Sequence, residues 1–337
     1  MTTPLLQVED LRVEFKTEDG IVRAVNGVSF EVRPGETLAI VGESGSGKSV
    51  TALSIMGLIE RPGRIAGGEL NFGGRSLRDL TEREYRRLRG GDLAMIFQDP
   101  LSSLNPSFRV GDQIAEALLT HSYDKKDAAR RQAANLLDLV GIPRAGDRAR
   151  DYPHQFSGGM RQRAMIAMAM ANKPRLLIAD EPTTALDVTI QAQVLEVLKR
   201  AQAETDAAML LITHDLGIVA GMADRVLVMY AGRVVEEGTL DEVFYEPRHP
   251  YTIGLLNSLP RLDSDRRHAL QTIPGTPPNL LALTEACALA PRCAFAQDRC
   301  RAESPELELV GSTLHRSSCF RSKELVELAG AGTVGAS

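Results

Sequence analysis

No apolar run in this 337-residue chain approaches the ~18 residues that a helix needs to cross a bilayer. The N-terminal stretch Met1–Phe15 also places charged residues where a signal peptide needs its apolar segment. We therefore expect a soluble, cytoplasmic protein that works at a membrane only by docking onto other subunits. An excess of basic charge is lacking too, because 39 Lys and Arg stand against 44 Asp and Glu, a net charge of -5. This balance argues against a nucleic-acid partner, whose phosphate backbone favours a basic face.

Cysteine is absent from the first 286 residues, and all four cysteines follow in the spacing C-x5-C-x6-C-x18-C. They are Cys287, Cys293, Cys300 and Cys319. In a reducing cytosol such a cluster indicates a metal site rather than disulfides. The spacing lacks the paired C-x2-C of zinc ribbons, and four thiolates can hold either Zn²⁺ or an iron–sulfur cluster. The wide spacing favours the larger cluster, while zinc and unligated thiols remain as alternatives.

The length predicts one large domain with a smaller one appended, and a hydrophobic content of 43% is enough for a sizeable core. Prolines become frequent from Pro247 onward, just before the cysteines. We expect the large domain to cover 1–250 and the small one 251–327. The tail 328–337, rich in Gly and Ala, is expected to be frayed.

Short all-apolar runs predict a parallel sheet that is buried on both faces. They cover 38–41, 175–179 and 208–213, and a helical pattern over Val188–Glu204 separates the last two. Strand–helix–strand alternation of this kind indicates a parallel sheet with covering helices.

Further strands and helices flank this sheet in the pattern. The segment 5–15 is predicted as an edge strand and 24–32 as a second strand, whereas 225–230 and 233–236 form a strand pair. Residues 100–170 are mostly helical in pattern, with an amphipathic helix over Asp127–Val140. These residues therefore read as a helical insertion in an α/β core.

The segment Gly42–Ser49 fits the phosphate-binding loop G-x-x-x-x-G-K-[ST] in full, between a buried strand and a helix. Its glycines, Gly42, Gly45 and Gly47, allow backbone N–H groups, with Ser44 among them, to form a nest for phosphate oxygens at a helix N-terminus. Lys48 is expected to reach the β- and γ-phosphates, and the Ser49 hydroxyl to bind Mg²⁺. The sequence therefore predicts a nucleotide site here.

A pair of carboxylates, Asp180 and Glu181, ends the second apolar run. An Asp at the end of a buried strand can hold Mg²⁺ through water, and the carboxylate after it can orient or deprotonate the attacking water. Such a pair is often only a solvated turn. Together with the phosphate loop it indicates ATP hydrolysis.

The segment Phe156–Gln162, with Ser157, Gly158 and Gly159 opening a helix, closely resembles the signature sequence of the ABC ATPases. In that family the segment meets the γ-phosphate bound by the opposite subunit of a head-to-tail dimer. The resemblance implies an α/β fold, namely an ABC-type P-loop ATPase with a RecA-like core. It also implies an N-terminal antiparallel β subdomain, a helical insertion and a small C-terminal extension that contains the cysteines.

Other elements of the family occur in the expected order, and the resemblance implies their roles. Gln98 matches the Q-loop glutamine, which senses Mg²⁺ and the membrane partner. The D-loop, which contacts the other subunit of the dimer, matches Ala185–Asp187. His214 matches the switch histidine on the γ-phosphate, and Phe15 stands where an aromatic residue stacks on adenine.

A narrower resemblance links the chain to the ATPases of dipeptide and oligopeptide importers, over roughly residues 5–320. It rests on the stretches Phe97–Pro106, Gly159–Arg163, Asp180–Gln193 and Arg248–Thr252. The Met160-Arg161 and Pro182-Thr183-Thr184 variants resemble the first of the two ATPase subunits that these importers carry.

This resemblance implies ATP and Mg²⁺ as ligands and peptide import as the function. It implies a heterodimer with a sister ATPase, two transmembrane permease subunits and, indirectly, an extracytoplasmic peptide-binding protein. The C-terminal cysteine pattern of such ATPases is associated with a 4Fe–4S cluster. Nickel and glutathione importers share the same features and remain alternatives. A soluble ABC protein of translation or DNA repair is disfavoured, because there is one cassette and no extended heptad run. A nucleotide sensor without hydrolysis is disfavoured because Glu181 is present.

Overall fold

The computed structural model describes residues 3–99, 103–122, 125–184, 186–259, 273–283 and 285–325. The tail predicted over 328–337, and Ala185 of the predicted D-loop, lie outside these ranges. Within them, no helix combines the length and the apolar character that crossing a bilayer requires. The chain forms two compact units, each assembled from several stretches. The first comprises Met1–Leu6, Glu31–Thr37 and Asn71–Ile212, and the second Gln7–Phe30, Leu38–Leu70 and Thr213–Ser337.

A parallel sheet lies at the centre of the first unit. Its strands are β6 (Leu93–Ile96), β7 (Leu176–Asp180) and β8 (Ala208–Thr213), with β7 between the other two. The register sets Ile96 beside Ala179 and Asp180 beside Ile212. Every residue of β7 and β8 is buried, which confirms that the apolar runs form a sheet covered on both faces. The carboxyl ends of these strands meet at one edge, from which the candidate site residues of this unit follow.

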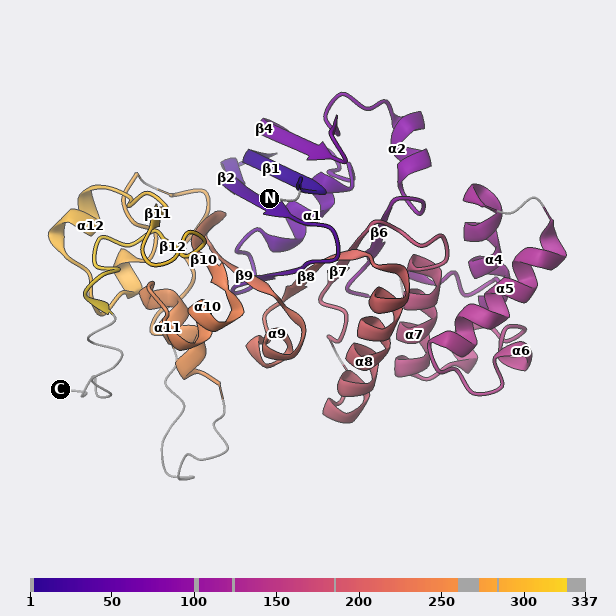
Figure 1. Ribbon diagram of the computed structural model, residues 1–337. Helices are drawn as coiled ribbons and strands as arrows, with labels where there is room; N and C mark the ends of the chain where they lie inside the picture. The colour runs from indigo at the N-terminus through magenta and orange to yellow at the C-terminus, as the bar shows by residue number, and fades with distance from the viewer. Residues whose placement is uncertain are drawn as a thin grey trace. The chain divides into compact units, whose positions relative to one another are not determined.

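Helices make up most of the rest of the first unit. They are α2 (Glu82–Leu88), α4 (Val110–His121), α5 (Lys126–Leu139), α6 (Ala145–Arg148), α7 (Gly158–Ala169) and α8 (Val188–Thr205), with a short 3₁₀ turn η1 (Pro153–Gln155). Helices α4 to α7 pack against one another (Figure 1). The buried side chains of α5, at positions 129, 133, 136 and 137, recur at helical spacing, which confirms the predicted amphipathic helix. The two-residue strand β5 (Arg75–Ser76) pairs with Asn71 and Phe72.

The second unit contains the strands near the N-terminus. They are β1 (Leu6–Thr17), β2 (Gly20–Val32) and β4 (Gly63–Phe72), in the order β2-β1-β4. The prediction that the first strand lies at an edge is therefore wrong. Buried residues alternate with more exposed ones in β1 on either side of Glu9 and Asp10, where the pattern is interrupted. Such alternation indicates that one face of the strand is buried. It does not indicate whether the backbone is hydrogen-bonded to a neighbouring strand on one side or on both.

The other strands of the second unit carry the glycine-rich loop at one end. The strand before that loop, β3 (Thr37–Val41), runs parallel to β9 (Arg225–Tyr230), which pairs antiparallel with β10 (Arg233–Thr239). The last strands, β12 (Arg316–Ser317) and β11 (Glu308–Leu309), extend this arrangement beyond β10. The helices are α1 (Lys48–Ile55), α9 (Leu216–Met222), α10 (Leu240–Tyr245), α11 (Pro250–Asn257), the 3₁₀ turn η2 (Ala290–Arg292) and α12 (Asp298–Ala302).

The C-terminal region shares the core of the second unit. Leu289 is buried in the same cluster as Val226 and Tyr251, and Ile273 and Cys293 pack against it. The apolar residues of this region are therefore buried against strands from earlier in the chain, which stabilises the region.

A buried carboxylate also fastens the C-terminal region to β10. Glu236 is fully buried and accepts hydrogen bonds from the backbone N–H groups of Arg248 and His249, at 2.6 and 3.0 Å. Nε2 of His315 lies 2.9 Å from the same carboxylate. A buried carboxylate that water cannot reach needs hydrogen-bond donors from the protein. These contacts therefore fix the start of α11 and the strand β12 relative to β10.

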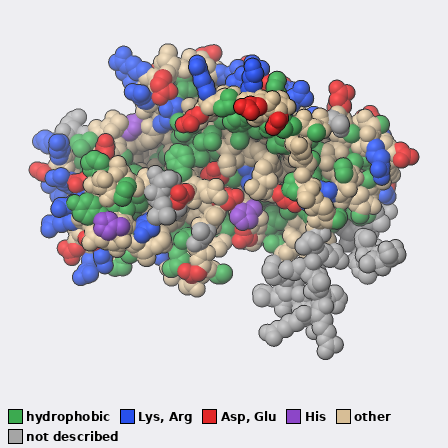
Figure 2. Space-filling model, turned by 180° about the vertical axis from the view of Figure 1, so that it is seen from behind, with side chains coloured by type: hydrophobic (Ala, Val, Ile, Leu, Met, Phe, Trp, Pro, Cys, Tyr) green, Lys and Arg blue, Asp and Glu red, His purple; other side chains and the backbone are tan. Residues whose placement is uncertain are grey.

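Acidic and basic side chains lie among one another over the face in view in Figure 2. This mixture agrees with the near balance of 39 basic and 44 acidic residues in the sequence.

Candidate functional site

The glycine-rich loop follows β3 directly and enters α1. Gly42 has φ +151°, and a Cβ at this position would lie 2.2 Å from the carbonyl oxygen of Met229. At Gly47, where φ is +102°, a Cβ would lie 2.5 Å from the carbonyl oxygen of Ala24. Only glycine fits at both places. Gly47 is also the N-cap of α1 and offers no side-chain cap, so the N–H groups of the first turn keep their capacity to bind an anion.

The Lys48 side chain lies inside the loop, and the residue is 5% exposed. Its ammonium donates to the carbonyl oxygens of Gly42 and Glu43, at 2.8 and 2.9 Å. Carbonyl groups from the loop itself thus hold a buried positive charge at its centre. An ammonium placed in this way is suited to bind an anionic ligand that enters the loop.

The two carboxylates of the first unit lie at the end of β7. Asp180 is 5% exposed. Glu181 has φ +46° and donates its backbone N–H to Ile212 across the sheet, at 2.8 Å. Its Oε2 atom accepts from Gln98 Nε2 at 2.9 Å and from Thr184 Oγ1 at 2.8 Å. Gln98 lies just after the neighbouring strand β6 (Leu93–Ile96), so the parallel register brings together two residues that the sequence separates widely.

Thr184 was not among the predicted site residues. Its hydroxyl donates to the same oxygen of Glu181 as Gln98 does, and the two donors together orient the carboxylate. A hydroxyl residue three positions after a candidate catalytic carboxylate, on the same turn, is the signal that was available for it in the sequence.

The Ser157–Gly159 segment caps the helix α7. The hydroxyl of Ser157 accepts from the N–H of Met160 at 3.3 Å, while Ser157 and Gly158 are exposed. A Cβ on Gly159 would lie 2.5 Å from Ile190 Cγ2 of α8, so glycine permits close packing of the two helices. Asp187 caps α8 by accepting from the N–H of Ile190 at 3.0 Å. The predicted signature is therefore an exposed helix N-terminus, a geometry that favours an anion.

The remaining predicted residues lie in the second unit. His214 directly follows β8 and is exposed. Phe15 is half-buried on β1, and its ring leaves no room for a side chain at Gly63, where a Cβ would lie 2.6 Å from Phe15 Cε1. The Phe15 side chain therefore lies close to the backbone of β4 and stays partly exposed.

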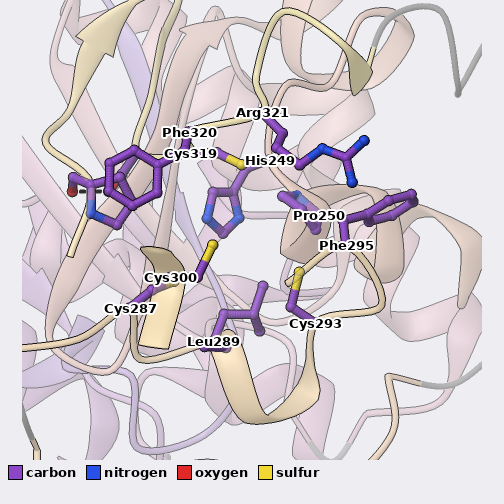
Figure 3. A pocket seen from close by; sticks show the side chains of 13 residues that line it. His249, Pro250, Cys287, Leu289, Cys293, Phe295, Cys300, Cys319, Phe320 and Arg321 are labelled. Atoms are coloured by element: carbon purple, nitrogen blue, oxygen red, sulfur yellow. Dashed lines mark hydrogen bonds between the residues drawn. The ribbon is translucent and has the colours of Figure 1, made fainter. Parts of the chain in front are cut away.

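The four cysteines line one pocket, together with His249 of the α11 N-cap (Figure 3). The space between the surrounding atoms, including the open mouth, is about 340 Å³. Among the described residues, no three or more His, Cys, Asp or Glu side chains are gathered so that they could hold a metal ion. The four thiols therefore line one pocket without forming such a group.

Burial sets the protonation of the groups in this pocket. It raises the pKa of Cys319 to about 11, and it also raises the pKa of Cys287 and Cys293. Desolvation lowers the pKa of His249 to about 3, so this imidazole is neutral. Arg321, which also lines the pocket, opposes this effect at Cys293, but burial outweighs it. A bound cation would stabilise the thiolates further.

Comparison with known proteins agrees with this geometry. Residues 25–184 match the model of the ABC transporter family, and residues 235–300 match that of the oligopeptide/dipeptide transporter C-terminal region. The chain is 54% identical over 320 residues to the oligopeptide transport ATP-binding protein OppD of Salmonella typhimurium, covering 95% of this chain and 94% of OppD. The chain belongs to the ABC transporter ATP-binding proteins of the oligopeptide/dipeptide group. It is an ATPase.

Other members and solved cassettes extend the comparison. The dipeptide transport ATP-binding protein DppD of Bacillus subtilis is 51% identical, with 96% of each chain covered. The ATP-binding cassette MJ0796, solved as a dimer in a post-hydrolysis state with ADP and Pi, is 26% identical with a TM-score of 0.63. It covers 70% of this ATPase and 98% of its own chain. CbiO1 of Clostridium perfringens gives 28% identity and a TM-score of 0.61, over 72% of this chain and 91% of its own.

Proposed function

We propose that this ATPase powers the import of dipeptides or oligopeptides through membrane permease subunits. The match of its C-terminal region to the oligopeptide/dipeptide transporter model supports this cargo most directly. The names of the relatives that match over nearly the whole chain point the same way.

In the proposed mechanism the loop 42–49 receives the phosphates of ATP, with Lys48 on the β- and γ-phosphates. Phe15 stacks on the adenine. Ser49, Gln98 and Asp180 would hold Mg²⁺, which would neutralise phosphate charge. The donor set fits this ion, because Mg²⁺ prefers hydroxyl, amide and carboxylate oxygens.

Hydrolysis in this proposal depends on two further side chains. Glu181, oriented by Gln98 and Thr184, accepts a proton from the attacking water or orients that water. His214 donates to the γ-phosphate. Ser157, Gly158 and Gly159 act in trans, since their exposed helix N-terminus closes over the γ-phosphate of the partner ATPase, and Asp187 contacts the same interface.

The proposed assembly is a heterodimer with a sister ATPase, docked under two permease subunits at the cytoplasmic face of the cell membrane. A peptide-binding protein on the other side of the membrane delivers the cargo. No nucleic-acid partner enters this proposal.

Transport is tested by deleting this gene in the native host and measuring uptake of a radiolabelled tripeptide. We expect uptake to fall to background and to return with the wild-type gene or with Lys199→Ala, a change on the exposed face of α8. Peptide uptake that persists, combined with loss of nickel or glutathione uptake, would contradict the peptide assignment.

We also propose that Cys287, Cys293, Cys300 and Cys319 hold a 4Fe–4S cluster. Their placement around one pocket supports this, because a four-iron cluster spreads its ligands over a volume, whereas a single ion gathers them at a point. A cationic iron core would displace the thiol protons when it binds. When bound, the cluster would link the segments that carry the four cysteines and so stabilise the C-terminal region.

Anaerobic purification is expected to give about four iron and four sulfide per chain, with broad visible absorbance. Cys300→Ser should lose most of both, whereas Ser318→Ala, which removes a hydroxyl from the same pocket, should keep them. Stoichiometric zinc without iron, or thiols that all react with a labelling reagent in the fresh protein, would contradict the cluster.

A further inference from the structure

Glu43, the second residue of the glycine-rich loop, is held by side chains from the C-terminal part of the second unit. Arg292 donates to both of its carboxylate oxygens, at 2.8 and 3.0 Å. The backbone N–H of Glu43 donates to the hydroxyl oxygen of Tyr251 at 2.7 Å. A bidentate guanidinium–carboxylate pair fixes orientation as well as distance, so these contacts define where the loop begins.

The residues that hold Glu43 are themselves fixed. The side chain of Arg292 is only 6% exposed, against 27% for Glu43. Arg292 Nε donates to the carbonyl oxygen of Pro274 at 2.8 Å, and Nη1 donates to the hydroxyl of Tyr230 at 3.2 Å. Tyr251 is 1% exposed, and its ring lies 4.6 Å from that of Tyr230. Hydrogen bonding to Glu43 raises the pKa of Arg292, which therefore stays charged at any relevant pH.

Glu43 also contacts the lysine side chain at the centre of the loop. Its carbonyl oxygen accepts from Lys48 Nζ at 2.9 Å. One residue therefore joins Arg292 and Tyr251 to the ammonium in the loop through its carboxylate, its N–H and its carbonyl. A shift of Arg292 or Tyr251 would therefore reach Lys48 through direct hydrogen bonds.

Arg292 also connects the loop to the cysteine pocket. It ends the turn η2 (Ala290–Arg292), which lies between Cys287 and Cys293. Cys293, the next residue, donates its N–H to the carbonyl of Ala290 at 3.4 Å. The segment 287–293 therefore carries two of the pocket's thiols and also the guanidinium that donates to Glu43 of the loop.

We propose that Arg292 and Tyr251 are positioning residues that hold the loop 42–49 in its nucleotide-binding conformation, so that the C-terminal region sets the ATP affinity of its own chain. This inference rests on the proposed role of that loop. It assigns to the C-terminal region a part in nucleotide binding in addition to any metal that it holds.

The test measures the Kd of the full-length protein for the non-hydrolysable analogue AMP-PNP, together with Tm and ATPase kinetics. Arg292→Met, which keeps the aliphatic stem, is expected to raise the Kd about tenfold. Tyr251→Phe is expected to raise it about threefold. In steady-state kinetics the KM for ATP should rise while kcat stays within about twofold, the pattern of lost binding rather than lost chemistry.

A double-mutant cycle separates a direct link from general destabilisation. Glu43→Gln combined with Arg292→Met should bind no more than about twofold more weakly than Arg292→Met alone, because the partners act through one contact. Arg299→Met is the matched control. Arg299 is exposed and pairs with Glu303 in the same region. The Arg299→Met variant should therefore bind AMP-PNP with the same Kd as the wild type.

Two results would overturn the inference. In the first, Arg292→Met and Tyr251→Phe are folded and bind AMP-PNP with wild-type affinity, while Lys48→Ala loses binding. In the second, Arg299→Met loses as much AMP-PNP affinity as Arg292→Met does. Unchanged affinity in Lys48→Ala would instead overturn the role of the loop. If Arg292→Met fails to fold, Tyr251→Phe and Arg292→Lys, which keeps the charge without the bidentate geometry, decide the question.

Discussion

Glu181→Gln is expected to lower the ATP hydrolysis rate about 1000-fold and to leave ATP affinity nearly unchanged. The amide keeps the size of the carboxylate and one acceptor oxygen for Gln98 and Thr184. It loses the negative charge and the capacity to accept a proton from water. The measurement is phosphate release at saturating ATP, with equilibrium nucleotide binding on the same preparation.

The matched control is Glu204→Gln, the same chemical change at an exposed carboxylate near the end of α8. It should hydrolyse ATP at the wild-type rate. Because Glu181 has φ +46° and is anchored through its backbone to Ile212, the substitution leaves the main-chain geometry in place. Phosphate release at the wild-type rate in Glu181→Gln would remove this residue from the mechanism.

The strands that bring the site residues together were readable from the sequence. Leu176–Asp180 and Ala208–Thr213 are uniformly apolar up to their last residues, and burial on both faces of a parallel sheet demands that pattern. The loop 42–49 was equally readable, because φ +151° at Gly42 and φ +102° at Gly47 exclude other residues.

The sequence did not predict which strands lie next to one another or which long-range contacts form at the site. The alternation in β1 is the same whether one or both of its edges are paired, so its central place could not be inferred. The Arg292–Glu43 pair joins residues 249 positions apart. Each is an ordinary charged residue in its local sequence, and only the folded chain brings them together. Charge pairing across such a separation leaves no periodic signal.

Lys48→Ala is expected to weaken ATP binding about 100-fold or more, since it removes a buried positive charge from the place where phosphate charge would be neutralised. Lys48 is 5% exposed, and its ammonium is held by the carbonyls of Gly42 and Glu43. Without it, those carbonyl oxygens face the incoming phosphates and repel them. The measurement is the Kd for AMP-PNP by calorimetry, with Tm recorded to establish that the variant is folded.

Lys199→Ala is the control for this change, because it removes the same group from an exposed position on α8. Its Kd should equal that of the wild type. Lys48→Ala leaves Glu181, Gln98 and Thr184 unchanged. At ATP concentrations high enough to restore occupancy, part of the hydrolysis should therefore return, limited by the weaker neutralisation of the γ-phosphate. A folded Lys48→Ala protein with wild-type affinity would show that the phosphates bind elsewhere on the chain.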